Sequence, residues 1–307
     1  MKKIVTICLI VAVLAALCAC AGPSGVSASS KSAVIDKDRA GNDITLPKKI
    51  DKVIALGPSN NEELIALGCA DKIIAADEYS ANIPGLPEGI PMFSILTPDG
   101  EQIINLNPDV IFATGMSIIG GDDPFQVVKD AGICVVYIPS SYSIEGIKED
   151  IRFMAAVMGK QARGAEIVKQ MEKDIAAVQA VAKTIKTPKK VYMEVGAPPY
   201  MVSMGKNTFM HEMIELIGAT NILGDQDGWI SVTDEAILEA NPDVILTSVN
   251  YIDDPIGDVY ARSGWDEITA IKNKDVYYID TDSSNRPSHN VVKAMKEMAK
   301  AVYPDKY

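Results

Sequence analysis

The sequence predicts an α/β fold with two similar lobes, each built on a mostly parallel sheet, joined by a single long rigid helix. A duplicated helix-to-strand motif, alternating strand and helix patterns, and one long amphipathic stretch predict this arrangement. The motif at residues 101–111 returns at residues 235–245, with seven of its eleven positions identical. A chain of 307 residues can form about two domains of roughly 100–200 residues each.

Each copy of the motif predicts a short helix, a tight stop and a buried strand. The stop is Asn-Pro-Asp, at residues 107–109 and 241–243, because a residue before proline is pushed out of the helical region. The apolar runs that follow, residues 110–113 and 244–247, are typical of parallel strands covered on both faces. One such unit in each half of the chain predicts two related lobes.

The N-terminus has the pattern of an export signal. Two lysines precede an apolar stretch at residues 4–17. This stretch is too short to span a bilayer, which takes about 20 residues. The stretch ends in Leu-Cys-Ala-Cys, which resembles the lipobox of bacterial lipoproteins and implies cleavage before Cys20 and diacylglycerol on its thiol. An ordinary signal peptide with incidental cysteines is the alternative. We therefore expect a signal at residues 1–19 and a flexible tether at residues 20–33.

Composition restricts the function. A net charge of −12 and a pI near 4.7 argue against nucleic acid as a partner, since phosphates require a basic surface.

Cys69 and Cys134 remain beyond the signal and anchor, and their apolar surroundings predict two separate buried thiols. A disulfide between them is the alternative in an extracytoplasmic setting.

The first lobe is expected at residues 34–159. It opens with a hairpin pattern that turns at Gly41-Asn42, and strands then alternate with helices, as in a parallel sheet wrapped by helices. The strands are expected at residues 52–56, 72–76 and 133–137, and the helices at residues 62–67, 124–131 and 143–158.

The connecting helix is expected at residues 160–187. Apolar residues recur there every three or four positions, and Pro188 follows its end. A helix of this length between two lobes would act as a stiff hinge that permits limited motion. The second lobe, residues 188–307, is expected to contain strands at 190–195 and 276–279 and helices at 208–217 and 290–302, with a short helix starting at Trp265.

Taken in order, these segments resemble the substrate-binding lipoproteins of bacterial ABC importers, of the class III type that serves ferric siderophores, haem and cobalamin. The resemblance rests on residues 38–47, residues 53–68, the two Asn-Pro-Asp motifs and residues 285–287. It implies a ligand in the cleft between the lobes, and an ABC permease with its ATPase as partners. It also implies a monomer, lipid-anchored to the cell membrane outside the cytoplasm, with no catalytic role and no cofactor of its own.

Other classes of function have less support. A metal-cluster enzyme on a similar fold would need a cysteine and histidine cluster, and the sequence contains neither this nor a phosphate loop. A site for bare zinc or manganese would need several histidines, and only His211 and His289 are present.

The ligand site is expected in the loops after the strands, since ligands of parallel sheets bind outside the carboxyl ends. Flat aromatic rings there suit a flat or greasy chelate, although each ring could pack within its own lobe instead. The guanidinium of Arg286 could hold an oxyanion, or pair with Asp280 or Asp282. The candidate ligand-binding residues are Ser59, Asn60, Tyr79, Phe93, Tyr200, Trp229 and Arg286.

Glu101 and Glu235 occupy the same place in the two copies of the motif. Either could simply offset a helix dipole in the first turn, where Asp99 and Thr233 can cap. The resemblance implies instead that each glutamate docks onto arginines of the permease.

The expected ligand is a ferric siderophore, hydroxamate-like because sparse loop arginines disfavour an anionic catecholate. A corrinoid is the alternative, on account of the aromatic side chains at the predicted site. Haem is less favoured for want of a clear axial ligand.

Overall fold

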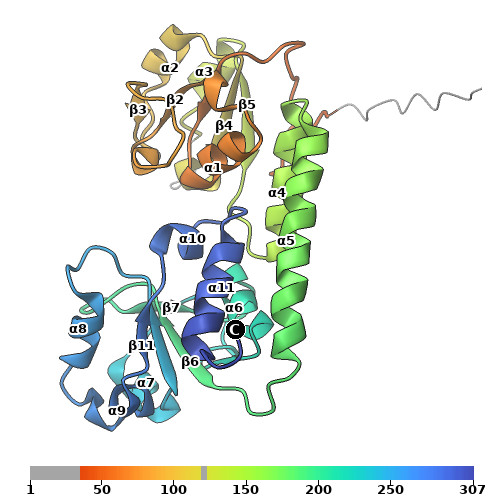
Figure 1. Ribbon diagram of the computed structural model, residues 1–307. Coiled ribbons are helices and arrows are strands. Elements are labelled where there is room, and N and C mark those ends of the chain that lie inside the picture. Colours follow the sequence, from red (N-terminus) through yellow and green to blue (C-terminus); the bar gives the residue numbers. More distant parts are fainter. Residues whose placement is uncertain (1–34, 119–122) are drawn as a thin grey trace, which may run out of the picture. The chain divides into compact units, whose positions relative to one another are not determined.

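The computed structural model describes residues 35–118 and 123–307 (Figure 1). It confirms the predicted α/β class with mostly parallel sheets. The predicted export signal, Cys20 and the tether lie outside the described residues.

The first lobe has a five-stranded parallel sheet in the order β3-β2-β1-β4-β5. Its strands are β1 (Val53–Ala55), β2 (Ile73–Asp77), β3 (Met92–Phe93), β4 (Val110–Thr114) and β5 (Cys134–Ile138). Its helices are α1 (Pro58–Ala66), α2 (Gly100–Leu106), α3 (Gln126–Asp130) and α4 (Ile144–Val157).

Helix α1 begins four residues earlier than predicted. Pro58 stands in its first turn, where the missing N–H costs nothing and the fixed φ suits a helix. Gly57 precedes it with φ of 113°, a conformation that favours glycine. The early start places Ser59 at the carboxyl end of β1.

The second lobe has a four-stranded parallel sheet in the order β11-β10-β6-β8 and a separate antiparallel pair, β7 with β9. The sheet strands are β6 (Lys190–Glu194), β8 (Thr220–Asn221), β10 (Val244–Thr247) and β11 (Val276–Tyr278), and the pair is β7 (Val202–Met204) with β9 (Trp229–Ser231). Its helices are α6 (Phe209–Leu216), α7 (Asp234–Ala240), α8 (Pro255–Tyr260), α9 (Thr269–Asn273), α10 (Thr281–Asn285) and α11 (Val291–Val302).

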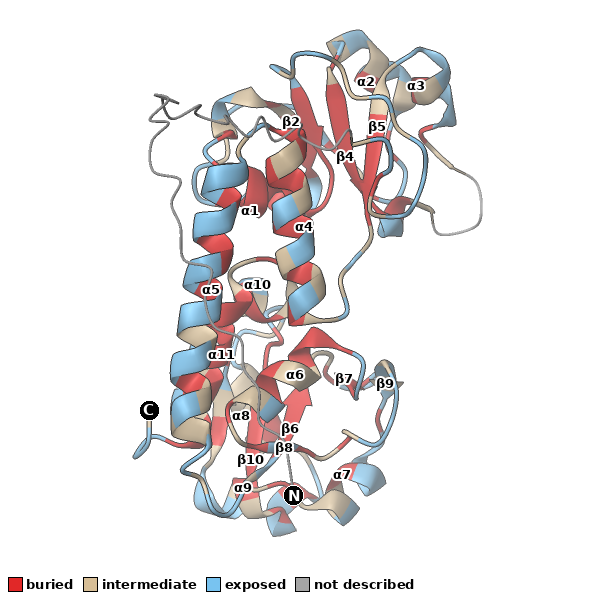
Figure 2. Cartoon of the chain, turned by 90° about the vertical axis from the view of Figure 1, so that its right-hand side faces the viewer, coloured by how far each residue is buried: buried red, intermediate tan, exposed pale blue. Residues whose placement is uncertain are grey.

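The long helix is α5 (Gln161–Ala182), which runs beside elements of both lobes (Figures 1 and 2). A Cβ on Gly164 would lie 2.4 Å from the Cβ of Ala155, so α4 and α5 can approach closely only because Gly164 has no side chain. One apolar cluster continues from the first sheet, through α4 and α5, to the second sheet and α11. The two lobes therefore share a core along α5.

The duplicated motif has the same structure in both lobes. Asn107 and Asn241 end α2 and α7 in the left-handed conformation, with φ of 49° and 45°. Asp109 accepts a hydrogen bond from the backbone N–H of Lys52 at 2.8 Å, and Asp243 accepts one from Lys190 at 2.8 Å. Each Asn-Pro-Asp thus ends a helix and fastens the start of the neighbouring strand.

Cys69 and Cys134, the two cysteines among the described residues, are unbridged, as predicted: Cys69 is buried and Cys134 is half-buried.

Candidate functional site

A pocket of about 260 Å³ lies at the carboxyl ends of the first lobe's strands, and a turn of the second lobe closes one side of it. Arg286 is the only charged side chain among the described residues that line it. The lining residues are Gly57, Pro58, Ser59, Tyr79, Ile95, Thr114, Met116, Ser140, Asn285, Arg286 and Pro287.

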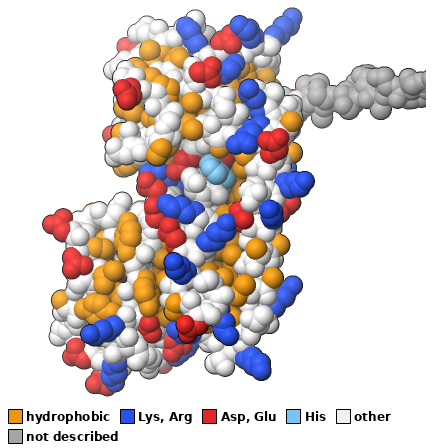
Figure 3. Space-filling model, in the orientation of Figure 1, with side chains coloured by type: hydrophobic (Ala, Val, Ile, Leu, Met, Phe, Trp, Pro, Cys, Tyr) orange, Lys and Arg blue, Asp and Glu red, His pale blue; other side chains and the backbone are white. Residues whose placement is uncertain are grey.

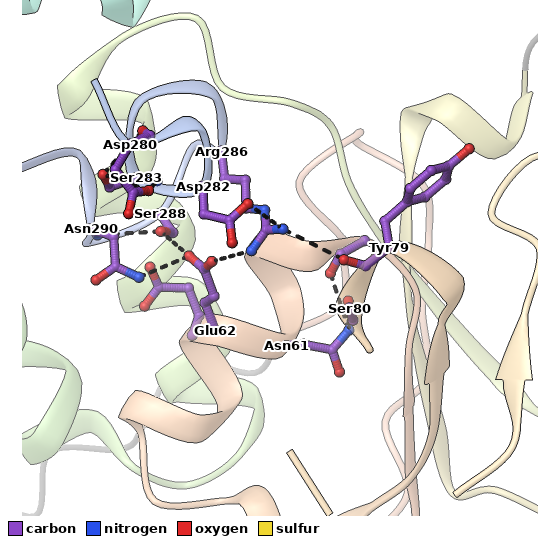
Figure 4. Close-up of polar contacts among 12 residues, drawn as sticks. Asn61, Glu62, Tyr79, Ser80, Asp280, Asp282, Ser283, Arg286, Ser288 and Asn290 are labelled. Carbon is purple, nitrogen blue, oxygen red and sulfur yellow. Dashed lines mark hydrogen bonds and ion pairs between the residues drawn. The ribbon is translucent and has the colours of Figure 1, made fainter. Parts of the chain in front are cut away.

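A buried carboxylate fixes the two loops that form the floor of this pocket. Asp77, at the end of β2, accepts hydrogen bonds from the backbone N–H of Gly57 at 2.9 Å and from the amide of Asn61 at 3.2 Å. It also accepts from the hydroxyl of Ser80 at 2.5 Å. Tyr79 stands between these anchored residues, and its ring points away from them (Figure 4).

Large side chains are exposed at strand ends in both lobes. Tyr79 is 56% exposed, Trp229 is 53% exposed and Tyr200 is 84% exposed, so none of the three is packed in a core. Three other exposed side chains of the same kind were not among the predicted site residues, although each follows a buried strand within a few residues. These are Met116, Tyr142 and Tyr251.

The structure does not bring every candidate to the pocket. Phe93 is 5% exposed and belongs to the core of the first lobe, so it cannot face a ligand. Asn60 is buried and donates its amide to the backbone oxygen of Leu56 at 3.0 Å, which is a structural role. Ser59 and Tyr79 do line the pocket.

The two lobes meet at a contact that we call the glutamate clasp, made of Glu62 and Glu63 on α1 and residues 286–290 of the second lobe. Figure 4 shows the part of it around Glu62. Glu62 accepts hydrogen bonds from Arg286 at 2.9 Å, from Asn290 at 3.0 Å and from the hydroxyl of Ser288. Its carboxylate is buried and takes all three donors from the other lobe.

The second half of the clasp pairs Glu63 with His289. One oxygen of Glu63 accepts from the backbone N–H of His289 at 2.6 Å and lies 3.1 Å from the ring Nδ1. Burial lowers the pKa of His289, but the hydrogen bond and charge of Glu63, together with the charge of Glu62, outweigh it and raise the pKa. The nearby charge of Arg163 lowers it slightly. The other oxygen of Glu63 is buried and has no partner among the described residues.

Arg286 is committed within the protein. Besides Glu62, it pairs with Asp282 at 2.7 Å, one of the two partners that the sequence suggested, and donates to the backbone oxygen of Tyr79 at 3.5 Å. A guanidinium with two carboxylate partners is already neutralised. Arg286 therefore shapes the pocket without offering a free positive charge to a ligand.

Glu101 and Glu235 are both exposed, in the first turns of α2 and α7. The caps of these helices are Asp99, which accepts from Gln102 N–H at 3.0 Å, and Thr233, which accepts from Ala236 N–H at 3.4 Å. Both glutamates remain exposed at the surface, although the Glu235 carboxylate also interacts with its own backbone N–H and with the Thr233 hydroxyl.

Two further observations concern the described residues alone. They contain no group of three or more histidine, cysteine or acidic side chains placed to hold a metal ion. None of their helices combines the length and the apolar character that a membrane crossing requires.

Two α/β lobes that share a core along one helix, with large side chains exposed at their strand ends, define a two-lobed solute-binding protein. The chain belongs to the periplasmic binding protein family, whose model matches residues 53–283. The predicted class, a binding protein of an ABC importer and not an enzyme, is confirmed.

Its relatives include the ABC transporter substrate-binding lipoprotein YvrC of Bacillus subtilis, which is 33% identical over 275 residues, covering 88% of this chain and 85% of that protein. A cobalamin-binding protein of Halobacterium salinarum is 25% identical, covering 88% of this chain and 74% of that protein. A solved structure of a possible iron-binding, periplasmic solute-binding protein from Staphylococcus epidermidis has a TM-score of 0.74 at 26% identity, covering 83% of this chain and all of that one.

The raised pKa of His289 predicts a pH-dependent stability. Protonated His289 should stabilise the fold below its ordinary pKa of about 6.5, and the contribution should be lost as pH rises through the raised folded-state value. The free energy of unfolding in urea should therefore differ most between wild type and Glu63→Gln at mildly acidic pH. The difference should shrink at alkaline pH.

The substitution His289→Gln provides the control, because it removes the titrating group. Adding Glu63→Gln to it should change stability by an amount that does not vary across this pH range. A wild-type advantage over Glu63→Gln that grows with pH would show that the charge pair does not operate.

Proposed function

We propose that this protein is the extracytoplasmic component of an ABC importer that captures a large, uncharged metal chelate, and that a corrinoid is the ligand that suits it best. The observation that carries the proposal is the chemistry of the strand ends. Aromatic side chains are exposed at strand ends of both lobes, and Tyr79 among them lines the pocket, whereas Arg286, the one charged residue among the described residues that line it, is neutralised. Aromatic faces bury large area at small entropic cost and need no ligand charge.

This chemistry orders the ligand classes. Catecholate siderophores, haem propionates and molybdate are anionic and would need free cations or many donors. A corrinoid ring or a neutral ferric hydroxamate would not. We rank the corrinoid first because the relatives include proteins named for binding cobalamin or vitamin B12. The ferric hydroxamate, the first expectation from the sequence, remains the second candidate.

Isothermal titration calorimetry of the domain starting at Ala21 tests this proposal. The titrants are cyanocobalamin, a ferrichrome-type hydroxamate, haemin and molybdate. We expect saturable binding of cyanocobalamin. Trp229→Ala and Tyr79→Ala should each weaken it by roughly tenfold or more, since buried aromatic anchors dominate such interfaces.

Met92→Ala is the matched control, because Met92 is 41% exposed but lies on the edge strand β3 and does not line the pocket. It should leave the affinity unchanged. Binding of haemin or molybdate alone would overturn the assignment of an uncharged ligand.

We also propose that Glu101 and Glu235 dock onto the permease. Their support is their equivalent, exposed placement on α2 and α7 with capping assigned to other residues. The pKa of Glu235 is lowered, first by its own backbone N–H and then by the Thr233 hydroxyl, so its carboxylate is ionised at neutral pH.

Replacing both glutamates by glutamine should abolish ligand-stimulated ATPase activity of the reconstituted transporter while leaving the affinity for the ligand unchanged. The reason is that the two side chains would contact the partner and not the chelate. Gln102→Ala and Glu239→Gln, which alter exposed residues of the same helices, are the controls. Normal stimulation by the double variant would refute the docking role.

Anchoring through a lipid on Cys20 is a further part of this proposal. Its support is the lipobox-like sequence that ends at Cys20. Cells that express the full chain should retain it in the membrane fraction, and Cys20→Ser should release it. Equal retention of both chains would contradict the anchor.

A further inference from the structure

The charges of this acidic chain are strongly segregated. Residues 160–190 and 291–307 together contain twelve lysines and arginines but five acidic residues, a net charge of +7. The whole chain carries −12, so the remainder carries −19. Charge separation on this scale creates an oriented field that a charged partner can recognise.

The two basic segments lie side by side in the fold, as α5, α11 and the residues that follow each helix. Lys296 of α11 pairs with Asp174 of α5 at 3.1 Å, which fixes the two helices against each other. Figure 3 shows Lys and Arg side chains along this pair. We call this surface the basic helix face.

Part of the positive charge on the basic helix face is uncommitted. Lys169, Lys173 and Lys300 are exposed and form no ion pair with any residue that the structure describes. By contrast, Arg163 pairs with Glu166, and Lys293 pairs with Asp280. A conventional solvated helix would balance its charges more evenly along its length.

The same face is hollowed by a groove of about 650 Å³ between α5 and α11. Its floor is apolar, from Ile167, Met171 and Val292, and its rim carries basic side chains. The charged residues that line the groove are the basic Arg163, Lys293, Lys296 and Lys300 and the acidic Glu166, Asp174 and Glu297. An apolar groove within a face whose segments carry a net charge of +7 matches the chemistry of an anionic phospholipid, whose phosphate and acyl chain meet at the membrane interface.

We propose that the basic helix face rests on the anionic headgroups of the membrane. The proposal relies on the extracytoplasmic location given above. The described chain begins on the helical layer, because Arg39 pairs with Glu149 and Asp150 of α4 at 2.9 and 2.6 Å.

This contact would set the orientation of the domain before it meets the permease. Helices α2 and α7, with Glu101 and Glu235, lie away from α5 in both Figures 1 and 2. A domain that rests on its basic helix face therefore keeps both glutamates out of the membrane contact, and it would have to leave that contact to dock them onto the permease.

Lysine footprinting tests this contact. The domain starting at Ala21 is anchored through an N-terminal polyhistidine tag to nickel-lipid vesicles, either of phosphatidylcholine alone or with roughly one third phosphatidylglycerol. Acetylation of each lysine is followed by mass spectrometry. We expect Lys169, Lys173 and Lys300 to react several-fold more slowly on the anionic vesicles, and high salt to abolish the difference. Lys48 and Lys274, exposed residues outside the face, should react equally on both.

Charge-removing variants give a second readout by vesicle co-sedimentation without the tag. Each lysine at an anionic surface is worth about a fivefold factor in partitioning, so K169Q/K173Q/K300Q should bind about a hundredfold more weakly. The matched control is K48Q/K52Q/K274Q, which removes the same charge elsewhere. Equal lysine reactivity on both vesicles would overturn the proposal, as would equal binding by the two variants or equal protection by soluble polyphosphate.

Discussion

The glutamate clasp is the contact on which the arrangement of the two lobes depends. Burying a carboxylate costs several kcal/mol unless partners replace its hydration, and Glu62 and Glu63 lie next to each other in α1. Among the described residues, every hydrogen-bond donor to these two carboxylates comes from residues 286–290. Separating the lobes at this point would remove these hydrogen-bond donors and leave both carboxylates to be solvated by water alone. The clasp therefore favours one relative position of the lobes.

Two other features also favour one relative position of the lobes. The apolar core continues along α5 from one lobe to the other, so the hinge itself is part of the packing. Gly164 lets α4 and α5 approach closely beside it. A cleft held in this way is largely formed before its ligand arrives, and a pre-formed site loses less entropy on binding. The clasp and Asp282 also neutralise the charge of Arg286, so this side chain offers no free positive charge at the pocket.

The sequence predicted what local patterns encode. Alternating strands and helices, the duplicated Asn-Pro-Asp units and the apolar period of α5 each leave a signal within a few turns of chain. The clasp has no such signal in the sequence, because Glu62 and Arg286 are 224 residues apart and either side chain could have faced water. For the same reason the sequence left Arg286 open between an oxyanion and a carboxylate partner. It also placed Phe93 among the candidate ligand residues, although this side chain folds into the core. Strands β7 and β9 are three residues each, too short to show an alternating pattern.

The central claim is that the clasp holds the lobes in one arrangement even without ligand. Double electron–electron resonance measures the distance between the lobes directly. The spin labels are placed at Asn105→Cys on α2 and Glu239→Cys on α7, and Cys69 and Cys134 are replaced by alanine. We expect one narrow distance distribution that ligand hardly shifts, and a broad one when Glu62 and Glu63 are both replaced by alanine. A ligand-free wild type as broad as that double variant would contradict the account.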